Sequence, residues 1–163
     1  MVGNVSGKVS VLFVCLGNIC RSSTAEAVLR SVVLNVGLDD CVEVASCGTA
    51  GYHIGEVPDS RSREVAKARG YDMATLRASQ LQDSDFEYYD FILAMDESNL
   101  ANLTMRCPQA CLAKLELFLT YAQSYDETEV PDPYYGGDQG FDHVLDLVED
   151  ACAGLLDAIK RSL

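Results

Sequence analysis

A cysteine and an arginine separated by five residues, Cys15 and Arg21, belong to the segment CLGNICRS at residues 15–22. A loop of this length can curl so that its backbone N–H groups converge on one point and bind an anion such as phosphate. The same dipoles, together with Arg21, favour the thiolate of Cys15, which is the nucleophilic form. The guanidinium can hold two phosphoryl oxygens in a fork and stabilise the charge of the transition state. The segment therefore predicts phosphoryl transfer through a cysteine nucleophile.

Three further residues of this segment suit such a loop. Gly17 can adopt backbone conformations that other residues avoid, and Asn18 tolerates the left-handed region. Ser22 can donate a hydrogen bond to the cysteine sulfur and help it leave a phospho-enzyme. A cysteine and an arginine at this spacing also occur by chance, as a buried strand end and a solvated cation. The sequence context around the loop favours the functional interpretation.

A general acid is needed for the leaving oxygen, and Asp132 is the best candidate. It lies between two prolines in the segment VPDPYYGG, residues 130–137, and the prolines stiffen the backbone that presents the carboxyl group. Tyr134 and Tyr135 could form the wall of an aromatic slot. Taken by itself, this segment is slightly more typical of a plain Asp-Pro turn in an acidic loop.

The elements around the loop must hold these residues in place. Residues 9–14 are apolar and rich in β-branched side chains, which predicts a buried strand that ends at Cys15. A helix is expected to open near Arg21, capped by Ser22 or Ser23, with Glu26 completing a capping box. Strand, loop and helix together place the anion site at the carboxyl end of the first strand, where ligands bind in parallel sheets.

The rest of the chain alternates between strand and helix patterns. Strands are predicted at residues 42–46, 91–95 and, from an ambiguous pattern, 113–119, and helices at 60–69, after Asp96 and from 141 onward, with loops at 48–58 and 123–140. This alternation predicts an α/β fold: a doubly wound, four-stranded parallel sheet with helices on both faces and the phosphate loop after strand 1. We expect residues 1–163 to form a single domain.

Composition and charge restrict the classes of partner. The net charge is −13, so nucleic acid and anionic membranes are not expected as partners, and an anion site must be built locally. No apolar run reaches the ~18 residues of a membrane span, and the start of the chain lacks a secretory signal pattern. We therefore expect a cytoplasmic protein. The odd number of cysteines, seven, argues against a disulfide framework, and no zinc-site spacing occurs, so a structural zinc site is not expected.

Four segments together resemble the low-molecular-weight protein tyrosine phosphatases. VLFVCLGNICRS at residues 11–22 is similar to the phosphate loop of that family, and DPYYG at 132–136 to its general-acid loop. TAGYHIG at 49–55 resembles its variable loop, and DFILAMDESNL at 90–100 its central strand and the start of the next helix. Two separated motifs in the right order are more specific than either one alone, and the resemblance spans nearly the whole chain.

The resemblance implies a role for each matching residue. Cys15 would be the nucleophile, Arg21 the phosphate clamp and Asp132 the acid that later activates water, in a two-step reaction without a metal or cofactor. Phosphotyrosine proteins would be the substrates, and the protein a monomer or weak dimer. The residues expected to bind phosphate are Leu16, Gly17, Asn18, Ile19, Cys20, Arg21 and Ser22.

Further implied roles concern the surroundings of the loop. Asn18, Ser22 and Ser46 would support the loop, and Cys20 could form a reversible disulfide with Cys15 under peroxide. The walls of the aryl slot would be Leu16, Tyr52, Tyr134 and Tyr135. Cys20 could instead simply pack beneath the loop.

The chain departs from the family pattern where Leu76 and Ser79 replace a frequent histidine and arginine. Two other enzymes on this fold remain as alternatives. An arsenate reductase needs a further cysteine just after the third strand, where residues 95–99 have none. A protein-arginine phosphatase tends to carry threonine at the position of Ile19 and to lack the paired tyrosines. A phosphate-binding module without turnover would be expected to lack Cys15, Arg21 or Asp132.

Overall fold

The computed structural model describes residues 8–133 and 139–163 of the chain. Tyr134 and Tyr135, two of the predicted slot residues, lie outside the described residues. Within the described part, no helix is both long enough and apolar enough to cross a membrane.

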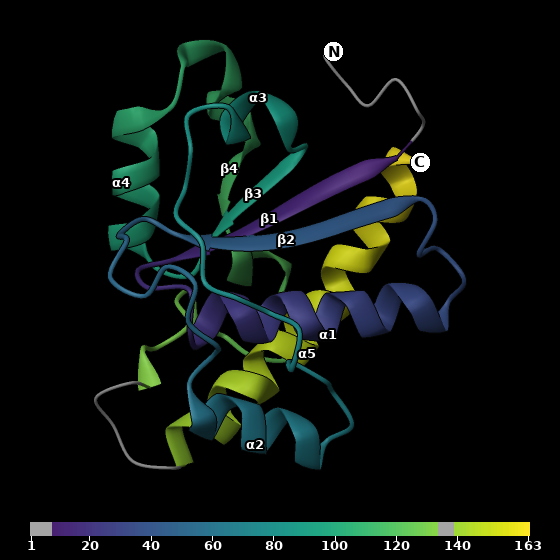
Figure 1. The fold of residues 1–163 in the computed structure, drawn as a ribbon. Helices are drawn as coiled ribbons and strands as arrows, with labels where there is room; N and C mark the ends of the chain where they lie inside the picture. The colour runs from purple at the N-terminus through teal and green to yellow at the C-terminus, as the bar shows by residue number, and fades with distance from the viewer. Residues whose placement is uncertain (1–7, 134–138) are drawn as a thin grey trace.

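A four-stranded parallel sheet forms the centre of the fold (Figure 1). Its strands are β1 (Val9–Cys15), β2 (Val42–Gly48), β3 (Phe91–Ala94) and β4 (Leu115–Leu117). They lie in the order β2-β1-β3-β4, and every neighbouring pair is parallel. The predicted doubly wound α/β fold with a four-stranded parallel sheet is confirmed.

Strand β1 lies in the interior of the sheet. β2 and β3 cover its two edges, and helices cover both of its faces. All seven of its residues are buried, as expected for a nearly continuous apolar run in a parallel sheet. Its last residue, Cys15, pairs with Gly48 of β2, and Val14 pairs with Ala94 of β3. The carboxyl ends of the three strands therefore meet where the predicted phosphate loop begins.

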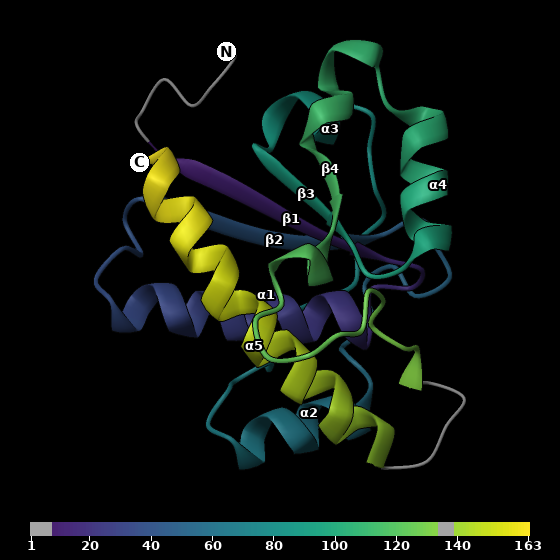
Figure 2. The ribbon, with the colours of Figure 1, turned by 180° about the vertical axis from the view of Figure 1, so that it is seen from behind.

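Helices cover both faces of the sheet (Figures 1 and 2). On one face lie α1 (Arg21–Asn35) and α5 (Gln139–Ser162), with α2 (Ser60–Ala68) packed against α5. On the other face lie the short α3 (Asp85–Tyr88) and α4 (Glu97–Arg106). Each face has its own apolar core, one built around Phe13 and Phe118 and the other around Phe86 and Leu103.

Helix α5 lies unusually close to the chain that leaves β4. A Cβ atom added to Gly154 would lie 2.0 Å from the backbone oxygen of Tyr121, so only glycine permits this approach. The helix thereby packs against the 3-10 helix η2 (Phe118–Tyr121) and closes the core beneath β1.

Several predicted boundaries were wrong. Only Leu115–Leu117 of the predicted strand at 113–119 is extended; the 3-10 helices η1 (Gln109–Lys114) and η2 flank it on either side. Helix α3 was not predicted, because four residues are too few to show a helical period. Helix α5 begins two residues before the predicted start, inside the segment predicted as a loop.

The predicted capping box at the start of α1 was also wrong. The cap position is Cys20, and its side chain makes no capping hydrogen bond. Ser23 donates to the carbonyl oxygen of Cys20 at 3.3 Å, and Glu26 accepts from Ser46 instead of reaching back to the helix start. The first-turn N–H groups of α1 belong to the loop that precedes it, which explains why a local cap is not needed.

Candidate active site

The loop between β1 and α1 curls around the sulfur atom of Cys15. Cys15 Sγ lies 2.9 Å from the hydroxyl oxygen of Ser22 and accepts the backbone N–H of Asn18 at 3.2 Å. One hydrogen-bonding partner of the sulfur thus comes from the loop and the other from the first turn of α1.

Asn18 determines the shape of the loop. Its φ angle of 61° is the one positive value among the described non-glycine residues. Its Nδ2 donates to the hydroxyl oxygens of Ser22 at 2.8 Å and Ser46 at 2.9 Å, and its Oδ1 accepts the backbone N–H of Ser79 at 2.9 Å. Three contacts thus hold a left-handed turn that a side chain would otherwise disfavour.

The buried carboxylate of Glu26 hydrogen-bonds the Ser46 side chain that holds Asn18. Ser46 donates to Glu26 at 2.6 Å, and Glu26, which is 6 % exposed, also pairs with Arg30 one turn later in α1. Burial raises the pKa of Glu26, while the Ser46 hydroxyl and Arg30 act in the opposite direction. The hydrogen bonds therefore run continuously from Glu26 through Ser46 and Asn18 to Ser22 and the sulfur.

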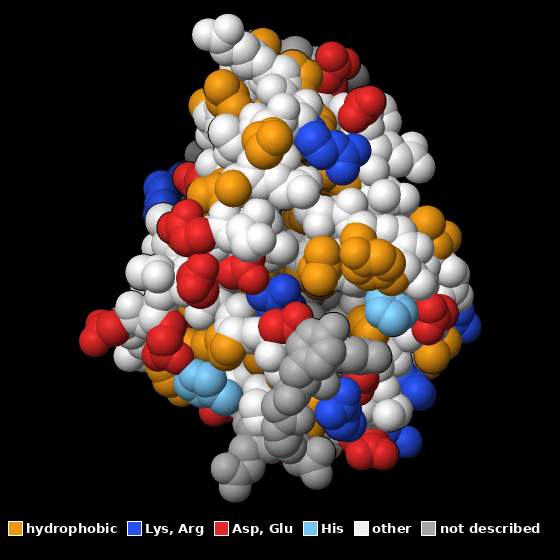
Figure 3. Space-filling model, turned by 90° about the vertical axis from the view of Figure 1, so that its left-hand side faces the viewer, with side chains coloured by type: hydrophobic (Ala, Val, Ile, Leu, Met, Phe, Trp, Pro, Cys, Tyr) orange, Lys and Arg blue, Asp and Glu red, His pale blue; other side chains and the backbone are white. Residues whose placement is uncertain are grey.

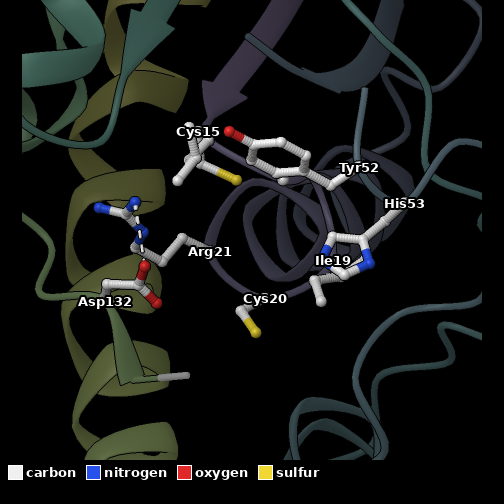
Figure 4. A pocket seen from close by; sticks show the side chains of 9 residues that line it. Cys15, Ile19, Cys20, Arg21, Tyr52, His53 and Asp132 are labelled. Carbon is white, nitrogen blue, oxygen red and sulfur yellow. Dashed lines mark ion pairs between the residues drawn. The ribbon is translucent and has the colours of Figure 1, made fainter. Parts of the chain in front are cut away.

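Arg21 is buried beside the loop and held at one end of its guanidinium group. Its Nη1 donates to Oδ2 of Asp96 at 2.7 Å and to the carbonyl oxygen of Val130 at 3.0 Å. Its Nη2 lies 3.8 Å from Oδ2 of Asp132 (Figure 4). These contacts bring the predicted clamp and the predicted acid together, although 111 positions separate them in the chain (132 − 21).

A pocket opens above the sulfur, and most of the predicted site residues line it. Figure 4 shows Cys15, Arg21 and Asp132 facing the same space, with Tyr52 and His53 across from Asp132. The full lining is Cys15, Leu16, Gly17, Ile19, Cys20, Arg21, Tyr52, His53 and Asp132. Asn18, Ser22 and Ser46 stay outside the lining because they lie behind the loop and support it.

The role of Gly17 differs from the expected one. Its φ angle is not in the left-handed region, so backbone freedom is not what this position requires. A Cβ atom here would lie 3.0 Å from Cδ2 of His53, whose ring lies against the loop. His53 Nδ1 in turn lies 3.0 Å from a carboxylate oxygen of Glu56. Glycine thus lets the variable loop close over one side of the pocket.

Cys20 lines the pocket but has a poorly reactive thiol. Burial, and then the nearby carboxylate of Asp59, raise the pKa of Cys20 to about 12. At neutral pH its side chain is therefore almost entirely in the thiol form. The pocket thus contains two cysteines in very different surroundings.

Sequence reasoning missed the residues that position Arg21. From the sequence, Asp96 only marks where a helix is expected to begin. In the structure, one of its oxygens accepts the N–H of Asn99 at 2.7 Å and the other holds Arg21. The position of Asp96 directly after the third strand, at the same sheet edge as Cys15, could have indicated this second role. No sequence signal marked the Val130 carbonyl or Glu26. At the departure from the family pattern, Ser79 contacts Asn18 through its backbone, which any residue can supply.

Comparison with known proteins gives the family directly. Residues 10–163 match the family model described as low molecular weight phosphotyrosine protein phosphatase. A low molecular weight phosphotyrosine protein phosphatase of Schizosaccharomyces pombe is 48 % identical over 143 residues, which cover 86 % of this chain and 91 % of the relative. The human protein of the same name is 42 % identical over 150 residues, covering 91 % and 94 % of the two chains.

A solved structure agrees with this assignment. The crystal structure of a protein tyrosine phosphatase from Entamoeba histolytica superposes with a TM-score of 0.92 at 43 % identity, covering 94 % of this chain and 98 % of the other. Fold, loop geometry and sequence therefore lead to one conclusion: the chain belongs to the low molecular weight phosphotyrosine protein phosphatase family.

Proposed function

We propose that this protein hydrolyses phosphotyrosine in proteins, and small aryl phosphates, through a phospho-cysteine intermediate. The observation that carries the proposal is the position of Cys15 Sγ, which accepts the Asn18 N–H and lies below a pocket shared by Arg21 and Asp132. One domain, residues 1–163, would contain the whole active site.

In the first step, the Cys15 thiolate attacks phosphorus and the bond to the tyrosine oxygen breaks. Asp132 protonates the departing phenolate oxygen, so that phenol rather than phenolate leaves. Arg21 binds the phosphoryl oxygens through Nε and Nη2, because Asp96 and the Val130 carbonyl already hold Nη1. The backbone N–H groups of residues 16–22 bind the remaining charge.

In the second step, Asp132 now accepts a proton from water, and the resulting nucleophile breaks the sulfur–phosphorus bond to release inorganic phosphate. The sulfur leaves as a thiolate. Ser22, whose hydroxyl oxygen lies 2.9 Å from Cys15 Sγ, donates to this thiolate and stabilises it. Both steps use side chains and backbone of this chain alone.

The pocket walls favour an aryl group over other phosphoesters. Leu16 and Tyr52 are 42 % and 74 % exposed, and both line the pocket, so a flat ring can bind between them. Tyr134 and Tyr135 would complete the slot, as the family resemblance implies. Ile19, in the position where a threonine tends to mark arginine phosphatases, lines the same pocket and favours tyrosine.

The test is metal-free hydrolysis of matched phosphotyrosine and phosphoarginine peptides in the presence of EDTA. We expect turnover that prefers phosphotyrosine and disappears in Cys15→Ser, while calorimetry shows that this variant still binds inorganic phosphate. A preference for phosphoarginine would overturn the substrate assignment and keep the mechanism. If neither peptide is hydrolysed, the proposed function is wrong, and arsenate reduction and simple phosphate binding become the remaining alternatives.

We further propose that the protein acts in the cytoplasm as a monomer or weak dimer. All seven cysteines are free thiols, a state that a reducing compartment maintains. The net charge of −13 opposes association with nucleic acid and anionic membranes and opposes close self-association.

A further inference from the structure

The mouth of the catalytic pocket differs in chemistry from one side to the other. Figure 3 shows hydrophobic side chains and a histidine gathered on one side of the central cation, and acidic side chains gathered on the opposite side. The apolar side includes Tyr52, which lines the pocket across from Asp132 and is 74 % exposed (Figure 4). A substrate that reaches Cys15 must pass between these two sides.

The acidic side is tied to the site through Arg21. The two groups that hold Nη1 of Arg21 are Asp96 and the carbonyl of Val130. Glu97 follows Asp96 in the chain, and Glu129 precedes Val130, so each glutamate is one residue from a contact of the catalytic arginine. The backbone N–H of Glu97 donates to Oε2 of Glu129 at 2.7 Å, which fixes the two segments side by side.

These two glutamates form an exposed anionic surface. Within residues 8–133 and 139–163, neither Glu97 nor Glu129 forms an ion pair. Segment 126–132 reads DETEVPD, with four acidic residues and no basic one. Glu127 of this segment is paired with His143 at 2.6 Å. The surface therefore has negative charge that a bound cation would stabilise, next to the two segments that hold Arg21.

We propose that Glu97 and Glu129 select phosphotyrosine segments that carry basic residues on one flank of the tyrosine, while the apolar side, which includes Tyr52, contacts apolar residues on the other flank. This inference rests on the proposed phosphotyrosine hydrolysis. An extended peptide advances about 3.3 Å per residue, so residues one to three positions from the tyrosine reach the rim on each side. Because the two sides differ, the segment has a preferred direction across the mouth.

Acidic flanks would be rejected by the same surface. Like charges placed together without a counter-ion are unfavourable, and this effect discriminates between partners as much as attraction does. The selectivity is electrostatic and exposed to solvent, so it must weaken as salt is added. It acts on the flanks of the substrate and leaves the chemistry at the sulfur untouched.

The test compares phosphotyrosine peptides that differ only in two flanking residues: arginine on the N-terminal flank, arginine on the C-terminal flank, neutral residues, or glutamate. For the wild-type protein we expect kcat/KM to rise about 3- to 20-fold for one of the two arginine peptides relative to the neutral one, the range for two exposed ion pairs. The glutamate peptide should be the poorest substrate. The gain should shrink between 50 mM and 500 mM salt.

Glu97→Gln/Glu129→Gln should abolish the gain while hydrolysis of p-nitrophenyl phosphate stays unchanged. Glutamine keeps the acceptor for the Glu97 N–H and removes only the charge. The matched control is Asp39→Asn/Asp40→Asn, which removes two exposed charges just before β2, at the opposite end of the sheet. This control should retain the gain, which separates a local contact from the overall charge.

The outcomes also separate this inference from the proposed function. If the wild-type protein hydrolyses neither p-nitrophenyl phosphate nor any peptide, the proposed function fails. If it hydrolyses all peptides equally, or gains equally from arginine on either flank, only the directional selection is wrong. A gain that survives in Glu97→Gln/Glu129→Gln would likewise overturn the assignment of these two residues.

Discussion

Asp96 holds the guanidinium group of Arg21 in place. Its Oδ2 accepts from Arg21 Nη1 at 2.7 Å, and its Oδ1 accepts the backbone N–H of Asn99 at 2.7 Å. One carboxylate thus joins the phosphate clamp to the first turn of α4 on the other face of the sheet. The orientation of Arg21 is determined by a residue that contacts no substrate in the proposed mechanism.

Asp96→Asn tests this positioning. Asparagine can still cap the helix, but its amide group then faces the buried Arg21 guanidinium, so the free energy of unfolding should fall by a few kcal/mol, about 3–5 at most. The value of kcat/KM for p-nitrophenyl phosphate should fall about 10- to 100-fold, the range for losing a charged hydrogen bond. Steady-state kinetics and urea unfolding measure the two effects. A variant with normal kcat/KM would show that the Val130 carbonyl alone positions the arginine.

Asp132→Ala should slow hydrolysis of aryl phosphates by roughly 10²- to 10⁴-fold, because the leaving oxygen loses its proton donor. The loss should be smaller for phenols that leave easily as anions. Kinetics with a series of substituted phenyl phosphates measure both effects, with Asp126→Ala as a control on the same acidic segment. An unchanged rate in Asp132→Ala would remove this residue from the mechanism.

Asn18 can be tested by separating its backbone role from its side-chain contacts. Asn18→Ala loses the contacts to Ser22 and Ser46 and strains a residue at φ 61°. Asn18→Gly loses the same contacts without the strain and should be more stable than Asn18→Ala by about 1 kcal/mol. Both should lose roughly 10- to 100-fold in kcat/KM. Activity restored in the glycine variant would mean that only the backbone matters.

We propose that Cys20 protects Cys15 under peroxide, and Cys20→Ser tests this. Peroxide oxidises the Cys15 thiolate to a sulfenic acid, and the Cys20 thiolate then displaces hydroxide to form the disulfide. Wild-type activity should return on adding dithiothreitol, whereas activity lost from Cys20→Ser should not. Cys41→Ser, at the start of β2, is the control.

The raised pKa of Cys20, about 12, adds a pH signature to the same experiment. Below that pKa the thiolate fraction rises about tenfold per pH unit, so disulfide formation should accelerate from pH 6 to pH 9. The rate of disulfide formation is measured by quenching the reaction, digesting the protein and counting the linked peptides by mass spectrometry. Full recovery of Cys20→Ser would show that Cys20 merely packs beneath the loop.

The raised pKa of Glu26 predicts the direction in which the free energy of unfolding changes with pH. Burial raises its pKa, so above the ordinary glutamate value the unfolded chain has released a proton that the native state still binds. The free energy of unfolding therefore falls as pH rises through this interval. Relative to Glu26→Gln, which has no such proton, the wild-type protein should lose stability in urea titrations as the pH rises above the ordinary glutamate pKa. Parallel curves for the two proteins would contradict the raised pKa.

Local sequence patterns are enough to predict the candidate site and the class of the fold. The spacing of Cys15 and Arg21, the strand before them and the helix after them are local, and a loop of five residues has few ways to join such elements around an anion. Alternating strand and helix patterns likewise led to the parallel sheet, which the structure confirms. Local patterns were less reliable at the capping box of α1, where Glu26 turned to Ser46.

The contacts around the loop, by contrast, follow from the three-dimensional fold and could not be read from local patterns. Arg21 meets Asp96 and the Val130 carbonyl across 75 and 109 positions of the chain, and Asn18 meets Ser79 across 61. These contacts depend on the strand order β2-β1-β3-β4 and its register, which bring distant carboxyl ends to one edge of the sheet. No local spacing encodes that order. The tertiary fold therefore decides which carboxylate holds the arginine and which charges flank the pocket.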